Sequence, residues 1–168
     1  AGFTPEVFEE FLQTRDEPEW VTQARRDAFE LYQEKLAEPL DQEEWKRVDL
    51  RAFRPGKFQL RDDSFDAGNL GTLMLDRADF AGSVVHVDSH YARGSASEEL
   101  KVRGVLFGDL ATMLREHGDT LRPHFATRAV QAGTDRFSAW HAAFWTGGTV
   151  LYVPTGVTID EPLYSLIG

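Results

Sequence analysis

The chain of 168 residues contains no cysteine. This absence excludes a disulfide framework, thiolate-bound zinc, a cysteine nucleophile and a cysteine-ligated iron–sulfur cluster within the chain. The length allows one ordinary hydrophobic core or two small ones, so the fold does not need covalent cross-links. A chain without cysteine is compatible with a reducing compartment, and we expect a cytoplasmic protein.

Basic residues and long hydrophobic runs are also scarce. Acidic residues outnumber basic residues 28 to 18, which gives a net charge of -10, and the Lys and Arg residues are scattered. A surface of this charge repels phosphate backbones, so nucleic acid is not expected as a partner. No apolar run approaches the roughly 18 residues that cross a bilayer, and the sequence does not start with a signal-peptide pattern. The composition therefore predicts a soluble protein that does not bind membranes.

Helical patterns dominate the N-terminal part of the chain. Thr4 followed by Pro5 is typical of a helix start, because threonine caps a helix and proline fits its first position. A second start at residues 16–18 opens a longer helix, which Pro39 ends. Apolar residues recur in that helix at spacings of three and four: Trp20, Ala24, Ala28 and Leu31. The pattern predicts two amphipathic helices.

Short runs of β type replace the helical pattern between residues 58 and 107. The runs are FQL (58–60), LGTLML (70–75), SVVHVDS (83–89) and KVRGVLF (101–107). Because glycine, aspartate and serine interrupt them, they predict a small mixed sheet. Helical signals then return, with Asp109 as the cap of a helix that ends near Gly118 and Asp119 as the start of a brief helix to Phe125.

A further helix is expected over residues 135–145. Phe137, Trp140, His141 and Phe144 follow the spacing of one helix face. We predict that this aromatic stripe makes the helix a central packing element. His141 on such a face is either a buried acid or base or a core histidine with a satisfied hydrogen bond, and we favour the core histidine.

Two short apolar runs follow the glycine pair at 147–148. They span residues 150–153 and 157–159, and a Pro-Thr-Gly turn separates them. Strands this short need neighbours. The sequence therefore predicts a change of architecture, with a helical and mixed α+β domain over residues 1–146 and a different core that starts in residues 147–168.

The most metal-like spacing in the chain is His86, Asp88 and His90. On one strand these side chains share a face and lie about 7 Å apart along it. The same alternation also arises when Val85 and Val87 face the core and the three polar residues face water, and we favour this second interpretation. A small metal-dependent enzyme that uses the three residues stays an alternative.

Signatures of catalysis are absent from the sequence. It contains neither the GxSxG elbow of serine hydrolases nor the GxxxxGK[ST] loop that binds nucleotide phosphates. We therefore expect no enzyme, and assign no catalytic, cofactor-binding or metal-binding residue.

The most specific pattern of the chain is the order of helix, glycine pair, strand and Val-Pro-x-Gly turn in residues 137–163. Further stretches accompany it: EPEW (17–20), Arg25, AF (28–29), EEWK (43–46), DL (49–50) and GVLFGDLATMLREH (104–117). Together these stretches resemble the SufB/SufD family of iron–sulfur cluster assembly proteins over residues 17–163. The EEWK and DL pieces resemble SufD more than SufB.

This resemblance implies a particular fold. Family members have an N-terminal helical region, a long central β-helix, and a C-terminal helical region that docks the SufC ATPase. Residues 150–159 would then form the first rung of the β-helix, with the later rungs missing from the sequence. We expect an N-terminal fragment whose residues from about 149 onward are either poorly ordered or paired with a neighbouring copy through the cut β-helix edge.

The resemblance also implies a function, that of a non-enzymatic scaffold subunit with SufB-like and SufC-like partners in the full-length protein. The N-terminal region would cap the open end of the β-helix. The iron–sulfur cluster would be handled by the full complex, because the family residues thought to hold it lie in the later β-helix. No cofactor is expected in this fragment. A generic acidic protein-interaction module unrelated to clusters is a further alternative.

Overall fold

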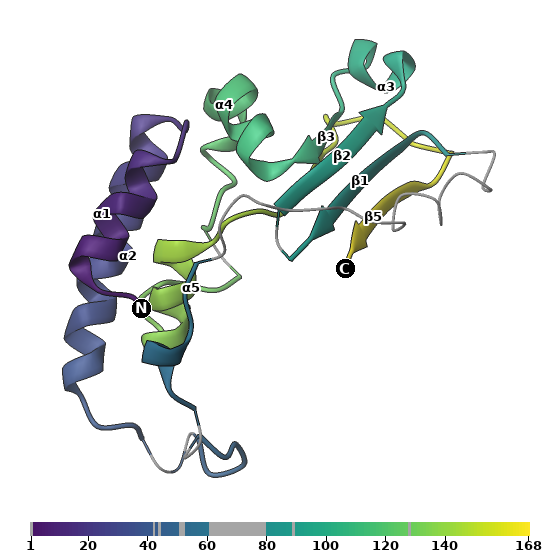
Figure 1. Cartoon of the computed structure of the whole chain (residues 1–168). Helices are drawn as coiled ribbons and strands as arrows, with labels where there is room; N and C mark the ends of the chain where they lie inside the picture. The colour runs from purple at the N-terminus through teal and green to yellow at the C-terminus, as the bar shows by residue number, and fades with distance from the viewer. Residues whose placement is uncertain are drawn as a thin grey trace. The chain divides into compact units, whose positions relative to one another are not determined.

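The computed structural model describes residues 2–41, 43, 45–50, 53–60, 80–88, 90–127 and 129–168. The chain forms two compact units (Figure 1). The first unit combines Ala1–Asp63 with Ala126–Trp145, and the second combines Ser64–Phe125 with Thr146–Gly168. Each unit is therefore built from segments that are far apart in the sequence. None of the described helices is both long and apolar enough to span a bilayer.

The first unit begins with the two predicted helices, α1 (Pro5–Gln13) and α2 (Glu19–Ala37). Thr4 caps α1 as expected, and its side chain accepts a hydrogen bond from the Val7 N–H at 3.4 Å. The α2 helix starts directly after Pro18 and ends before Pro39. A short 3-10 helix, η1 (Pro55–Lys57), follows. The predicted start of α1 and the predicted start and end of α2 are therefore confirmed.

The buried face of α2 differs from the predicted one. The buried side chains are Val21, Arg25, Ala28, Phe29 and Tyr32. Only Ala28 belongs to both sets, whereas Ala24 is exposed. The spacing of apolar residues failed here because an arginine occupies the centre of the buried face.

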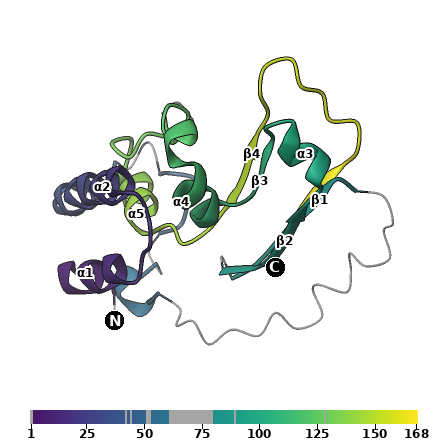
Figure 2. The same cartoon turned by 90° about the horizontal axis from the view of Figure 1, so that it is seen from above.

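The core of the first unit is aromatic, and α5 (Arg136–Phe144) is central to it. Figures 1 and 2 show α5 beside α2, against which it packs. The Phe144 ring contacts the rings of Phe3, Phe8, Phe11 and Phe29 at centroid distances of 4.9, 5.4, 5.6 and 5.7 Å. The predicted packing role of this helix is therefore confirmed for Phe144.

The sheet of the second unit has three strands: β1 (Gly82–Val87), β2 (His90–Ala96) and β5 (Leu163–Ile167). β1 lies between the other two, antiparallel to β2 and parallel to β5 (Figure 1). A second pair joins β3 (Leu106–Asp109) to β4 (Thr149–Tyr152) in antiparallel register (Figure 2). The helices α3 (Glu98–Val102) and α4 (Leu110–Leu121) connect to these strands. The α+β prediction with small sheets is therefore confirmed.

Several predicted elements in the second unit are wrong in extent. The run at 101–107 begins in α3 and becomes a strand only at Leu106, and the run at 58–60 is not a strand. The run at 70–75 lies outside the described residues. The α4 helix is interrupted at His117, where the backbone is non-helical, so the predicted break near Gly118 is present, but the helical turn that follows ends at Leu121 and not at Phe125. The apolar composition of these runs did not show which of their residues form strands and which form helices or turns.

The C-terminal strands correct a second expectation. Residues from 149 onward were expected to lack partners in this chain, but β4 pairs with β3 and β5 pairs with β1. The run at 157–159 is not a strand, and β5 was missed. Val157 and Ile159, the ends of the run at 157–159, instead pack on a small core of Ala81, Leu100 and Val105. That these strands open a β-helix stays a prediction, as does the division into domains 1–146 and 147–168.

Candidate functional site

His86 does not face solvent, so its predicted exposure is wrong. It lies on the central strand β1 with 2% of its surface exposed, and its Nε2 is 3.1 Å from Asp109 Oδ1. The pairing of β1 with β2 shifts register between Val85 and His86, where the consecutive residues Val84, Val85 and His86 are all buried. The extra residue at this shift, Ala92, lies on β2, so the alternation of β1 itself is intact and both of its faces are covered. The prediction had assumed that one face of the strand meets water, as in a half-exposed sheet.

Asp88 and His90 do not join His86 in a site. Asp88 is exposed in the turn after β1 with a φ of 48°, and His90 is the first residue of β2. His90 Nδ1 lies 3.0 Å from the Asp88 carbonyl oxygen. Among the residues that the structure describes, no group of three or more His, Asp or Glu side chains is arranged to hold a metal ion. The hairpin thus separates side chains that one strand would have brought together.

Asp109 links three elements of the second unit. It is the last residue of β3 and the N-cap of α4, and its Oδ2 accepts hydrogen bonds from the N–H and hydroxyl of Thr112 at 3.0 and 3.1 Å. Its Oδ1 faces His86, whose Nδ1 is buried without a hydrogen-bond partner. Burial, and then the negative charge of Asp109, raise the pKa of Tyr91. His86 and Asp109 are both buried, and their contact joins β1 to the junction of β3 and α4.

A buried ion pair in the first unit was not predicted as a site. Arg25 Nε donates to both carboxylate oxygens of Glu17, at 2.8 and 3.1 Å, and the two side chains are only 1% and 5% exposed. In the sequence, Arg25 is distinguished only by the family resemblance. The available signal was its spacing of four residues from Val21 and from Phe29, which places it on their helix face.

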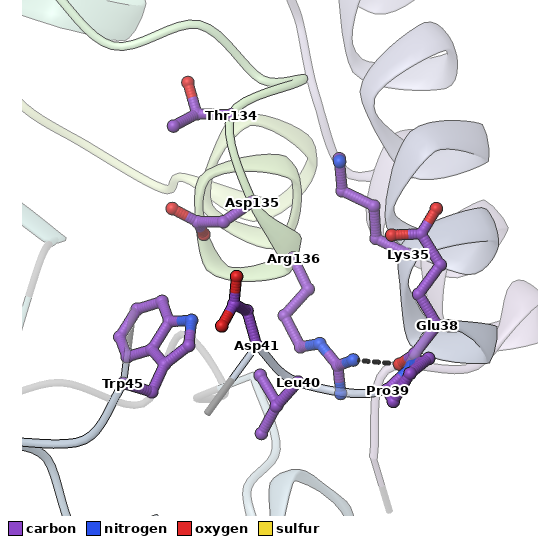
Figure 3. A pocket seen from close by; sticks show the side chains of 9 residues that line it. All are labelled: Lys35, Glu38, Pro39, Leu40, Asp41, Trp45, Thr134, Asp135 and Arg136. Carbon is purple, nitrogen blue, oxygen red and sulfur yellow. Dashed lines mark hydrogen bonds between the residues drawn. The ribbon is translucent and has the colours of Figure 1, made fainter. Parts of the chain in front are cut away.

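A small pocket in the first unit lies between the end of α2, the segment after it and the start of α5 (Figure 3). The lining residues are Lys35, Glu38, Pro39, Leu40, Asp41, Trp45, Thr134, Asp135 and Arg136. The Arg136 guanidinium donates to the Glu38 carbonyl oxygen across it. Its volume of about 110 Å³ holds roughly three or four water molecules. The lining combines charged side chains, such as Lys35 and Asp135, with the apolar Pro39 and Leu40.

Asp135 at the edge of this pocket is the N-cap of α5. Its Oδ1 accepts from the Phe137 and Ser138 N–H groups at 2.7 and 2.8 Å. Burial raises the pKa of Asp135, but hydrogen bonds from Ser138 and Phe137 and the charge of Lys35 outweigh it, so the pKa lies below its usual range. The carboxylate therefore serves the helix cap and leaves the first N–H groups of α5 satisfied.

His141 is exposed on α5, so the prediction of a core histidine is wrong. The face of α5 that is fully buried consists of Ala139, Ala143 and Phe144, while Phe137 and Trp140 are half-buried. His141 lies two residues from each alanine and so points away from them. Ala139 and Ala143 belong to the same buried cluster as Ala28 of α2, and the search for aromatic residues did not predict their burial.

Comparison with known proteins identifies the family. The family model described as the SufBD protein N-terminal region matches residues 7–164. Iron–sulfur cluster assembly SufBD family proteins of Mycobacterium tuberculosis and Staphylococcus haemolyticus are 29% and 28% identical to the chain. The iron–sulfur cluster assembly protein SufB of Bacillus subtilis is 27% identical.

The chain matches only part of each relative. Each of the three alignments covers 96% of this chain but 20%, 37% and 37% of the relative, respectively. The family model, in contrast, accounts for almost all of the chain. The chain therefore belongs to the SufBD family and corresponds to the N-terminal region of that family.

Proposed function

We propose that the chain is the N-terminal portion of a scaffold subunit in a SufBCD-type complex that assembles iron–sulfur clusters. The observation that carries this proposal is the match of the SufBD N-terminal model to residues 7–164. The chain has no cysteine with which to bind a cluster by thiolates. The cluster is therefore bound elsewhere in the complex, and this region contributes structure.

The placement of the polar side chains supports a scaffold role. The His86–Asp109 and Glu17–Arg25 pairs are both buried, and their hydrogen bonds join elements of the fold. The alternative of a metal-dependent enzyme gains no support, because His86 is buried beside Asp109 whereas Asp88 is exposed in the turn after β1. The proposed role is therefore non-enzymatic.

The subunit type is part of the proposal. The EEWK and DL pieces at 43–46 and 49–50 resemble SufD, and we propose a SufD-like subunit with SufB-like and SufC-like partners in the cytoplasm. By resemblance to the family, SufC hydrolyses ATP, the SufB–SufD pair changes shape, and the cluster forms at their shared interface.

Co-purification of the natural full-length protein tests this function. The tagged protein is co-expressed with SufB-like and SufC-like proteins of the same organism, and subunit ratio, bound iron and acid-labile sulfide are measured. We expect all three subunits at fixed ratio, with iron and sulfide that depend on the SufB-like subunit. A full-length protein that purifies alone, or that binds the iron without its partners, contradicts the proposal.

A further inference from the structure

Arg25 is the largest of the fully buried side chains among the described residues, and it lies between α2 and the last turn of α5. Its Nη1 donates to the carbonyl oxygens of Ala143 and Trp145, at 3.1 and 2.9 Å. Its guanidinium carbon lies 3.6 Å from the centre of a Trp145 ring. The Arg25 side chain therefore contacts the end of α5 in two ways, through the backbone carbonyls of Ala143 and Trp145 and through the ring of Trp145.

The contacts fall where the chain leaves the first unit. The last carbonyl groups of a helix have no N–H donor inside the helix. Arg25 supplies a donor for two carbonyls at this end. Trp145 is the last residue of the first unit, and Thr146 begins the next segment of the second. The guanidinium thus fixes the backbone at the point of exit.

Stability alone does not account for a buried ion pair at this place. Burial lowers the pKa of Arg25, while the hydrogen bond and charge of Glu17 oppose that change. One donor, Nη2, is buried without a hydrogen-bond partner. Apolar residues of similar volume often replace such pairs without loss of stability. An apolar side chain at position 25, however, could not donate to the carbonyls of Ala143 and Trp145.

We propose that the Glu17–Arg25 pair is a latch that fixes the conformation in which the chain leaves the first unit, and that the aromatic core folds without it. Glu17 orients the guanidinium through two hydrogen bonds, and the guanidinium holds Trp145. With the latch closed, the chain after α5 starts from one fixed geometry. With the latch removed, the end of α5 frays, and residues 146–148, which lead to β4, become a free linker.

Hydrogen exchange on the whole 168-residue chain tests the latch. The double variant Glu17→Leu/Arg25→Met removes both charges at similar volume, so we expect its melting temperature to stay within a few degrees of the parent. The Trp145 amide, which donates to the His141 carbonyl at 2.9 Å, should exchange about tenfold faster. The amides of Phe29 and Ala139 should keep their protection.

Two further variants keep the test decisive. Arg25→Lys retains the charge but lacks the planar fork, so it should fold and still show faster exchange at Trp145. Glu9→Leu/Arg26→Met removes an exposed pair between α1 and α2, and should leave Trp145 exchange unchanged. Unchanged Trp145 protection in the Glu17→Leu/Arg25→Met variant overturns the proposal. So does unfolding of that variant, or loss of protection at Phe29 and Ala139, because the pair would then be needed by the core.

Discussion

Each of the two units of this chain is stabilised internally by a different kind of contact. The first unit buries an aromatic cluster from α1, α2 and α5, and each of these helices has its own start signal in the sequence. The strands of the second unit take partners that are distant in the sequence, as β1 does with β5 and β3 with β4. A capped helix can be recognised alone, whereas a strand is defined by its partner. We therefore expect C-terminal truncation to affect the second unit selectively.

The largest expected effect is that of ending the chain at Trp145. Without β4 and β5, the strands β1 and β3 lose partners, so their amides should lose protection in hydrogen exchange while α1, α2 and α5 keep theirs. Ending the chain at residue 160 removes only β5, and β3 should then stay protected. Protected β1 amides in the shorter chain would show that the second unit does not depend on its C-terminal strands.

Phe144→Ala tests the aromatic core of the first unit. Truncation of a buried phenylalanine costs roughly 3–5 kcal/mol in the free energy of unfolding, a large share of a typical domain's stability. Phe137→Ala should cost less, because Phe137 is half-buried. Leu36→Ala, at a side chain that is 45% exposed, is the control. If Phe144→Ala unfolds in urea at the same midpoint as Leu36→Ala, the assignment of the core is wrong.

Asp109→Ala compares helix caps in the two units. It removes the cap of α4 and leaves His86 Nε2 buried without its partner, for a combined cost of roughly 2–4 kcal/mol. The exposed cap of α1 has a longer hydrogen bond, so Thr4→Ala should cost about 0.5 kcal/mol. Chemical denaturation of both variants measures the difference. Equal costs would mean that His86 adds nothing to the role of Asp109.

Gly82→Ala tests close packing in the second unit. A Cβ on Gly82 would lie 2.8 Å from Phe107 Cδ1 and 2.8 Å from the Ser95 carbonyl oxygen. Overpacking of this kind costs roughly 1–3 kcal/mol. Gly133→Ala in the first unit is the matched control, since no atom lies within 4 Å of its added Cβ. Melting temperatures that fall equally for both variants would contradict this packing.

The smallest expected effect is that of adding a metal ion to the protein. Isothermal titration with zinc or iron should give no one-to-one, submicromolar complex, because His86 faces Asp109 and a hairpin turn separates it from His90. A complex of that strength that disappears on His86→Ala would reinstate the metal site. His141→Ala, at an exposed histidine of the other unit, is the control.

Predictability from the sequence followed the range of the interactions. Thr4, Pro39 and Asp135 act within a few residues, and the helix ends that they mark were predicted. The burial of His86 depends on Asp109 and on the covering of both faces of β1, and neither leaves a trace in the alternation of residues 83–89. The face of α2 was misplaced because an arginine counts as polar in a search for apolar spacing.

The sequence by itself determined the absence of thiolate chemistry, the acidic charge, the helix ends marked by Thr4, Pro39 and Asp135, and the family. These properties reside in composition and in short segments. The tertiary structure alone decided that Arg25 and His86 are buried and that β5 lies beside β1. The physical reason is that a charged group or a strand edge is stable in a protein interior only beside a partner. Such partners are brought together by the fold of the whole chain.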